Sequence, residues 1–124
     1  MSTGLSWVRR WGPALVWAAF IFVASSLPGT TYPSTDLPNA DKLVHIVLYG
    51  VLGALVVRGL GGRGVRIWLG AAALAALYGV TDELHQIFIP FRSADVEDAV
   101  ADAAGALLGA GLAVTFRKWR QSRR

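Results

Sequence analysis

Side chains capable of acid–base or ligand chemistry lie inside otherwise apolar stretches of this 124-residue chain. They are Lys42 and His45 in one stretch, Asp82, Glu83, His85 and Gln86 in the next, and Asp98 and Asp102 in a third. A histidine beside a carboxylate can act as a general base, and the same groups can bind a divalent metal. Lysine can bind a phosphate or a carboxylate. The pattern therefore indicates one polar site, built by elements that bring the three stretches together.

The composition is that of a membrane protein. Hydrophobic residues make up 54% of the chain and charged residues only 16%, whereas about a quarter of the residues of soluble proteins are charged. The chain has no cysteine, which excludes disulfides, thiolate metal sites and cysteine nucleophiles. Its twelve Lys and Arg residues give a net charge of +4. Because they cluster at the ends of the apolar segments, we expect no nucleic-acid partner.

Four apolar segments predict an all-α fold, an integral membrane four-helix bundle forming a single domain over residues 1–124. We expect the helices at about 11–27, 43–60, 67–89 and 95–116. With their flanks, helices of this length can cross about 30 Å of hydrocarbon. Helices are favoured because backbone groups in lipid must be hydrogen-bonded internally. The pair Gly105 and Gly109 predicts close packing of the last helix against a neighbour.

The basic residues predict the orientation. Ten of them precede the first apolar segment, follow the last one or lie between the second and the third. Only Lys42 and Arg92 lie in the other two connections. Short cytoplasmic connections carry an excess of Lys and Arg. Both termini are therefore expected in the cytoplasm, and the polar site in the outer half of the membrane.

The polar residues share a depth as well as a side. Counted from the inner ends of their segments, four of them lie 13 to 15 residues in: Ser25, His45, Asp82 and Asp102. At 1.5 Å per residue this depth is roughly 20 Å. An ionisable group there costs at least about 2.5 kcal/mol, so these groups should face one another or a wet cavity.

Helical angles assign these groups to faces. At 100° per residue, Lys42 and His45 share an arc and Asp95, Asp98 and Asp102 share another, while Glu83 points partly aside. We therefore expect that His45, Asp82, His85 and Asp98 meet in one outward-opening cavity. The alternative is structural: Asp95 caps a helix, and the interior groups form a polar network that only stabilises the bundle.

Three motifs in this order resemble the VanZ-like family, small bacterial membrane proteins named for an accessory protein of teicoplanin resistance. They are Asp-Lys-Leu-Val-His at 41–45, Tyr-Gly-Val-Thr-Asp-Glu-Leu-His-Gln at 78–86 with Arg92 after it, and Asp95-x-x-Asp98 followed by Gly105. The resemblance runs from Ser25 to Gly109 and implies a location as a multi-pass protein of the bacterial plasma membrane. It implies functional weight for ten residues, which we take as the binding site: Asp41, Lys42, His45, Asp82, Glu83, His85, Gln86, Arg92, Asp95 and Asp98. Two departures from the family pattern are Phe91, where a glycine is common, and Asp102, where an asparagine is usual.

The first functional hypothesis is recognition of a membrane lipid, a lipid-linked envelope precursor or a lipoglycopeptide. Such a role would contribute to teicoplanin-type glycopeptide resistance or to envelope homeostasis. In this hypothesis Lys42 and Arg92 bind a phosphate or carboxylate, and Asp82 and Gln86 form hydrogen bonds to sugar or peptide groups.

The second hypothesis is a membrane-embedded enzyme acting on the same class of substrate. His45 with Asp41 or Asp82, or His85 with Asp98, would supply the general base. Asp82, His85, Asp98 and His45 could hold a metal, but no recognised metal-binding spacing is present. We therefore assign no metal ligand or catalytic residue and leave the cofactor open. Proton-coupled transport is a third alternative, which 124 residues would support only in a homo-oligomer.

The orientation can be tested by cysteine labelling, because the chain has no cysteine of its own. A cysteine at Thr31 should react with an impermeant reagent in intact cells, and one at Gly62 should react only after lysis. The reverse pattern would put the polar site in the cytoplasmic half of the membrane.

Overall fold

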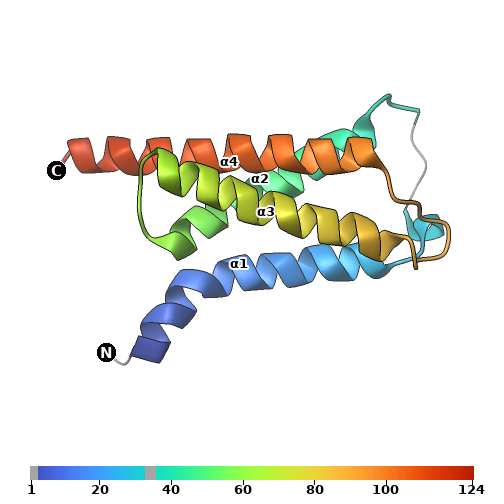
Figure 1. Cartoon of the computed structure of the whole chain (residues 1–124), viewed down its shortest axis with the longest axis horizontal. Helices are drawn as coiled ribbons and strands as arrows, with labels where there is room; N and C mark the ends of the chain where they lie inside the picture. The colour runs from blue at the N-terminus through green and yellow to red at the C-terminus, as the bar shows by residue number, and fades with distance from the viewer. Residues whose placement is uncertain (1–2, 33–35) are drawn as a thin grey trace.

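The computed structural model describes residues 3–32 and 36–124. The regular secondary structure of this part of the chain is all helical, with four long helices and one short turn of 3₁₀ helix: α1 (Thr3–Ser26), η1 (Gly29–Thr31), α2 (Ala40–Leu60), α3 (Val65–Gln86) and α4 (Val96–Ser122). The long helices lie alongside one another, and both ends of the chain lie at the same end of the bundle (Figure 1). The predicted all-α fold of four helices is confirmed.

The distribution of side chains is that of a protein surrounded by hydrocarbon. Large apolar residues cover the outside, with Leu77 63% and Leu112 72% exposed, while Asp102 is fully buried. A soluble protein rarely exposes a continuous apolar surface of this kind. Of the described helices, α2, α3 and α4 are long and apolar enough to cross a membrane. The chain is therefore a membrane protein.

Helix α1 differs from the other three long helices because a proline, Pro13, lies within it, shortly after Arg9 and Arg10. Its uninterrupted apolar run, residues 14–24, is too short to stand out as a span by composition. A proline inside a helix removes the hydrogen bond to the carbonyl four residues earlier. That carbonyl, of Arg9, accepts a hydrogen bond from Arg58 at 3.2 Å, and the start of α1 turns away from the bundle (Figure 1). That α1 also crosses the membrane stays a prediction.

The helix ends differ from those expected from hydrophobicity. Helices α1 and α4 extend beyond the apolar segments into the basic flanks, to Thr3 and Ser122. Helix α3 ends earlier than expected, at Gln86. Pro90 disfavours helical geometry in the residue before it, and the chain instead forms turns in which the amides of residues 88 and 89 donate to carbonyls three positions earlier.

Glycines bring α2 and α4 into backbone contact, the most extensive contact between any two helices of the bundle. A Cβ atom added at Gly105 would collide with the Ile46 backbone, and one at Gly109 with the backbone of Gly50. At Gly53 it would lie 2.7 Å from the carbonyl oxygen of Ala106. The predicted close packing of Gly105 and Gly109 is confirmed, with α2 as the partner.

Arginines join the helices at the end of the bundle that carries the termini. Arg10 donates to the carbonyls of Gly59 at 2.8 Å and of Leu60 at 3.1 Å, at the C-terminus of α2, where a positive charge complements the helix dipole. Arg117 donates to the Gly62 carbonyl at 3.0 Å. Together with Arg9 and Arg58, Arg10 and Arg117 line a basic pocket of about 450 Å³.

The packing of α2 on α4 predicts the effect of adding one methyl group. Gly105→Ala would place Cβ 2.8 Å from the Ile46 Cα, and overpacking of this kind costs about 1–3 kcal/mol. Gly70→Ala is the matched control, because its Cβ would lie 4.0 Å from the nearest atom. Thermal unfolding in detergent should show a lower midpoint for Gly105→Ala only. Equal midpoints would mean that Gly105 does not face α2.

Candidate functional site

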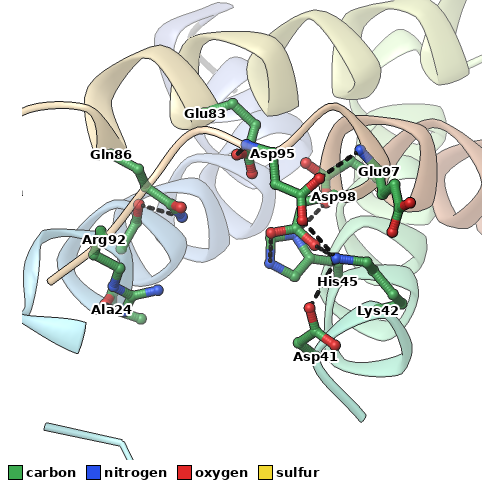
Figure 2. Close-up of polar contacts among 12 residues, drawn as sticks. Ala24, Asp41, Lys42, His45, Glu83, Gln86, Arg92, Asp95, Glu97 and Asp98 are labelled. Carbon is green, nitrogen blue, oxygen red and sulfur yellow. Dashed lines mark hydrogen bonds and ion pairs between the residues drawn. The ribbon is translucent and has the colours of Figure 1, made fainter. Parts of the chain in front are cut away.

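The exposed end of the site is organised around the ammonium group of Lys42. Its Nζ atom lies 2.8 Å from Asp41 Oδ2, 2.9 Å from Asp95 Oδ2 and 2.5 Å from Asp98 Oδ1. Figure 2 shows the carboxylates of α2 and α4 converging on this one group. Because an ammonium has three donors, all three are used within the protein.

Asp95 has two roles, one for each carboxylate oxygen. It is the N-cap of α4, where Oδ1 accepts a hydrogen bond from the Glu97 amide at 2.8 Å. The other oxygen meets Lys42. The Lys42 ammonium and, after it, the Glu97 amide hold the pKa of the Asp95 carboxyl below its usual range. Capping and site formation, which the sequence left as alternatives for Asp95, are combined in one residue.

One turn deeper, His45 links Asp98 to Asp102. Its Nδ1 lies 2.7 Å from Asp102 Oδ1, and its Nε2 lies 3.8 Å from Asp98 Oδ2. Exposure falls along this line, from 61% for the Asp41 side chain to 17% for Lys42, 14% for His45 and zero for Asp102. The site is therefore open at its outer edge and closed towards the middle of the bundle.

A second layer of polar groups surrounds Asp102. A Cβ added at Gly79 of α3 would lie 2.8 Å from Asp102 Oδ2, so this glycine makes room for the carboxylate. Asp82 is buried. The carboxylates of Asp82 and Asp102 lie close enough to the buried Tyr49 to interact with it electrostatically. Within the described residues, the Tyr49 hydroxyl and Asp102 Oδ2 have no hydrogen-bond partner. Unpartnered buried polar atoms are uncommon in proteins.

Glu83, a member of the expected binding set, points into the bundle, whereas its helical angle predicted that it points partly aside. It is only 5% exposed, and its Oε2 accepts a hydrogen bond from the Asp95 amide at 3.0 Å. Its other oxygen, Oε1, is buried and unpartnered within the described residues. The predicted orientation was wrong because α3 packs against both α2 and α4. A side chain of α3 that points between these two helices therefore still lies inside the bundle.

His85, Gln86 and Arg92 form a separate group that holds the end of α1. His85 Nε2 is hydrogen-bonded to Ser26 at 2.9 Å, and Gln86 donates to Ser25 at 3.2 Å. Arg92 donates to the Ala24 and Leu27 carbonyls, each at 3.2 Å. Figure 2 shows Gln86 and Arg92 apart from the Lys42 group.

The expectation that His85 shares a cavity with His45, Asp82 and Asp98 is therefore not met. His85 contacts α1, where its ring also stacks on Phe22 at a centroid distance of 4.8 Å. A shared helical face fixes the direction of a side chain but not the neighbouring helix that it meets. Within the described residues, His85 belongs to neither set of side chains with the spacing to hold a metal ion.

The residue before Arg92 has a special backbone geometry. Phe91 has φ of 60°, in the left-handed region that glycine adopts at little cost and phenylalanine does not. Its carbonyl packs against Gly29, where a Cβ would collide with it. A glycine would adopt this conformation without strain, and Phe91 adopts it nonetheless.

Two residues outside the expected binding set have partners within it. Asp102, which the sequence assigns to the polar layer only, is bonded to His45, and Ser26 is bonded to His85 in the group that holds α1. The depth count was the signal for Asp102. Serine at the end of an apolar helix gives no comparable signal.

Among the described residues, two sets of side chains have the types and spacing to hold a cation. His45, Glu83 and Asp98 offer ligand atoms within 4.8 Å of one another, and so do Asp41, Asp95 and Asp98. In the second set, the Lys42 ammonium already bonds to every member. The polar site as a whole gathers an excess of carboxylates around one lysine and one histidine.

An apolar groove adjoins the polar site. It has a volume of about 500 Å³ and lies between α2 and α4, lined by residues that include Ile46, Val47, Val51, Gly105 and Leu108. Ile46 follows His45 in the chain, and Gly105 lies one turn beyond Asp102. The groove and the polar site are therefore built by the same two helices.

Fold and site define a small helical membrane protein with a carboxylate-rich site at one end of its bundle. A sequence model of the VanZ/LLP1 family matches residues 8–117, and the chain belongs to this family. Neither a curated protein nor a solved structure matches it.

The division into two polar groups can be tested by disulfide or short-reagent crosslinking in membranes. Cysteine pairs at His45 and Asp102, and at Ser26 and His85, replace contacts of 2.7 and 2.9 Å. Each pair should crosslink efficiently against the cysteine-free background. A cysteine pair at His45 and His85, which takes one residue from each group, should not crosslink. Efficient crosslinking of this last pair would restore the single cavity expected from the sequence.

Proposed function

We propose that this protein binds an amphiphilic component of the bacterial cell envelope. Its head group binds at the polar site around Lys42 and Asp98, and its hydrocarbon tail lies in the groove between α2 and α4. The component is a lipid-linked envelope precursor or a lipoglycopeptide. Binding contributes to teicoplanin-type glycopeptide resistance or to envelope homeostasis. Membership of the VanZ/LLP1 family agrees with such a role.

The observation that carries the proposal is that the same two helices, α2 and α4, build both the polar site and the apolar groove. His45 of the site and Ile46 of the groove are neighbours in the chain. Because α2 and α4 have the length and composition of membrane spans, the groove faces lipid hydrocarbon. A head group bound at the site would leave its tail beside this groove.

The charges of the site define the head group it suits best. Lys42 already bonds to three carboxylates, so a free phosphate or carboxylate would have to displace one of them. Carboxylates accept hydrogen bonds from hydroxyl, amide and ammonium groups. A sugar- or amine-bearing head therefore fits better than a simple anion.

The proposed location is the bacterial plasma membrane, with both termini on the cytoplasmic side. The basic pocket of Arg9, Arg10, Arg58 and Arg117 lies at the end of the bundle that carries the termini. Its arginines use neutral carbonyls as partners, so their charges remain available to anionic cytoplasmic lipids. The carboxylate site then opens to the outer leaflet, where envelope precursors are assembled into the wall.

A second candidate function is hydrolysis or group transfer on the same substrate class. The observation in its favour is the pair of His45 and Asp102 at 2.7 Å, in which the carboxylate orients the imidazole as it does in general-base dyads. If His45→Gln abolishes the cellular phenotype while the purified protein still binds its lipid, chemistry is favoured over recognition.

The experiment is affinity purification from native bacterial membranes, followed by mass spectrometry of the retained lipids. We expect one class with a sugar- or amine-bearing head to be enriched over bulk lipid. Val47→Trp, which fills the groove from an exposed lining position, should reduce the enrichment about tenfold, a loss of about 1.4 kcal/mol in binding.

Val44→Trp is the matched control, because Val44 is a similarly exposed valine of α2 outside the groove. It should retain the lipid. Asp98→Asn should weaken retention by altering the head-group site instead of the groove. Equal retention by the wild-type protein and all three variants, or no enrichment over bulk lipid, would contradict the proposal.

A further inference from the structure

Three ligand-type side chains from three different helices converge beneath Lys42. His45 comes from α2, Glu83 from α3 and Asp98 from α4, and their ligand atoms lie within 4.8 Å of one another. Figure 2 shows these side chains pointing toward a common region. The chain brings them together although they are separated by up to 53 positions in the sequence.

Each of the three has one polar atom engaged by a neighbour and one that is not. His45 Nδ1 bonds to Asp102 at 2.7 Å, Glu83 Oε2 accepts from the Asp95 amide at 3.0 Å, and Asp98 Oδ1 accepts from Lys42. The engaged atoms fix the orientation of each group. Metal sites show this arrangement, in which the atom of each ligand that does not bind the metal is hydrogen-bonded to a second residue.

The other ligand atom of each group makes no hydrogen bond to any of the described residues. His45 Nε2 and Asp98 Oδ2 face each other at 3.8 Å, beyond hydrogen-bond length. Glu83 Oε1 is buried and has no partner within the described residues, and the Glu83 side chain is at least nine-tenths buried. A buried carboxylate oxygen without a partner is costly, and a bound cation would remove the cost.

We propose that His45 Nε2, Glu83 and Asp98 bind one divalent transition-metal cation, Zn²⁺ or Mn²⁺. Mixed imidazole and carboxylate ligands suit these ions, whereas Mg²⁺ and Ca²⁺ take oxygen ligands. Three protein ligands leave a coordination position for water or for a bound molecule, as in catalytic zinc sites. The inference goes beyond amphiphile binding and does not depend on it.

The competing acidic group does not carry such a site. Asp41, Asp95 and Asp98 also lie close together, but the Lys42 ammonium occupies the space between them. Asp41 is largely exposed. A cation there would have to displace the lysine, whereas a cation at His45 and Glu83 leaves the Lys42 contacts in place.

The test is metal binding by the purified full-length protein in detergent, after stripping with chelator. Isothermal titration with Zn²⁺, Mn²⁺ and Mg²⁺ should give one equivalent of zinc or manganese and much weaker magnesium binding. Glu83→Gln and His45→Gln should abolish stoichiometric binding. Asp102→Asn, which changes the hydrogen-bond partner of His45 but none of the three ligands, should weaken it about 10–100-fold.

Glu97→Gln is the matched control, because Glu97 is an exposed carboxylate of α4 whose side chain lies outside the cluster. It should bind metal as the wild type does. A second measurement uses the unmodified protein and so does not depend on whether the variants fold. The pulsed electron-spin resonance spectrum of bound Mn²⁺ should show one directly coordinated nitrogen. Absence of stoichiometric binding, equal loss in Glu97→Gln, or a spectrum without nitrogen would overturn the proposal.

Discussion

The ammonium group of Lys42 allows three carboxylates to lie together at one end of an apolar helix bundle. Asp98 is 9% exposed, and the outer surfaces of the same helices are apolar. A carboxylate in such surroundings is stable only when paired and hydrogen-bonded. Lys42 joins the first turn of α2 to the N-cap and first turn of α4. This fixes how far the two helices are shifted along each other, and the same alignment brings His45 to Asp102.

Close helix packing makes this arrangement possible. Gly105 and Gly109 let α4 approach the backbone of α2, and Gly79 of α3 makes room for the fully buried Asp102. Side chains at these positions would separate the helices and break hydrogen bonds of under 3 Å. The small residues therefore determine the geometry of the polar site as well as the stability of the bundle. The same approach of α2 to α4 forms the apolar groove that adjoins the site.

Much of the fold and part of the site could be predicted from the sequence because both follow from one-dimensional periodicities. Counting residues from the basic ends assigned His45 and Asp102 to one depth, and they lie 2.7 Å apart. Angles around a helix could not predict which neighbour each face meets, so His85 was expected beside His45 but lies against Ser26 of α1. The same limit hid the burial of Glu83. The prediction of α3 as far as residue 89 failed because hydrophobicity continues where Pro90 ends the helix.

The most direct measurement is a double-mutant comparison of unfolding free energies for Lys42→Met, Asp98→Asn and the two combined. If Lys42 is the counter-charge of a partly buried carboxylate, Lys42→Met leaves Asp98 unpaired and is the most destabilising of the three. Asp98→Asn should then partly rescue it, making the double variant more stable than Lys42→Met by about 1 kcal/mol or more. Additive losses, with the double variant the least stable, would contradict the account, because the two side chains would then act independently.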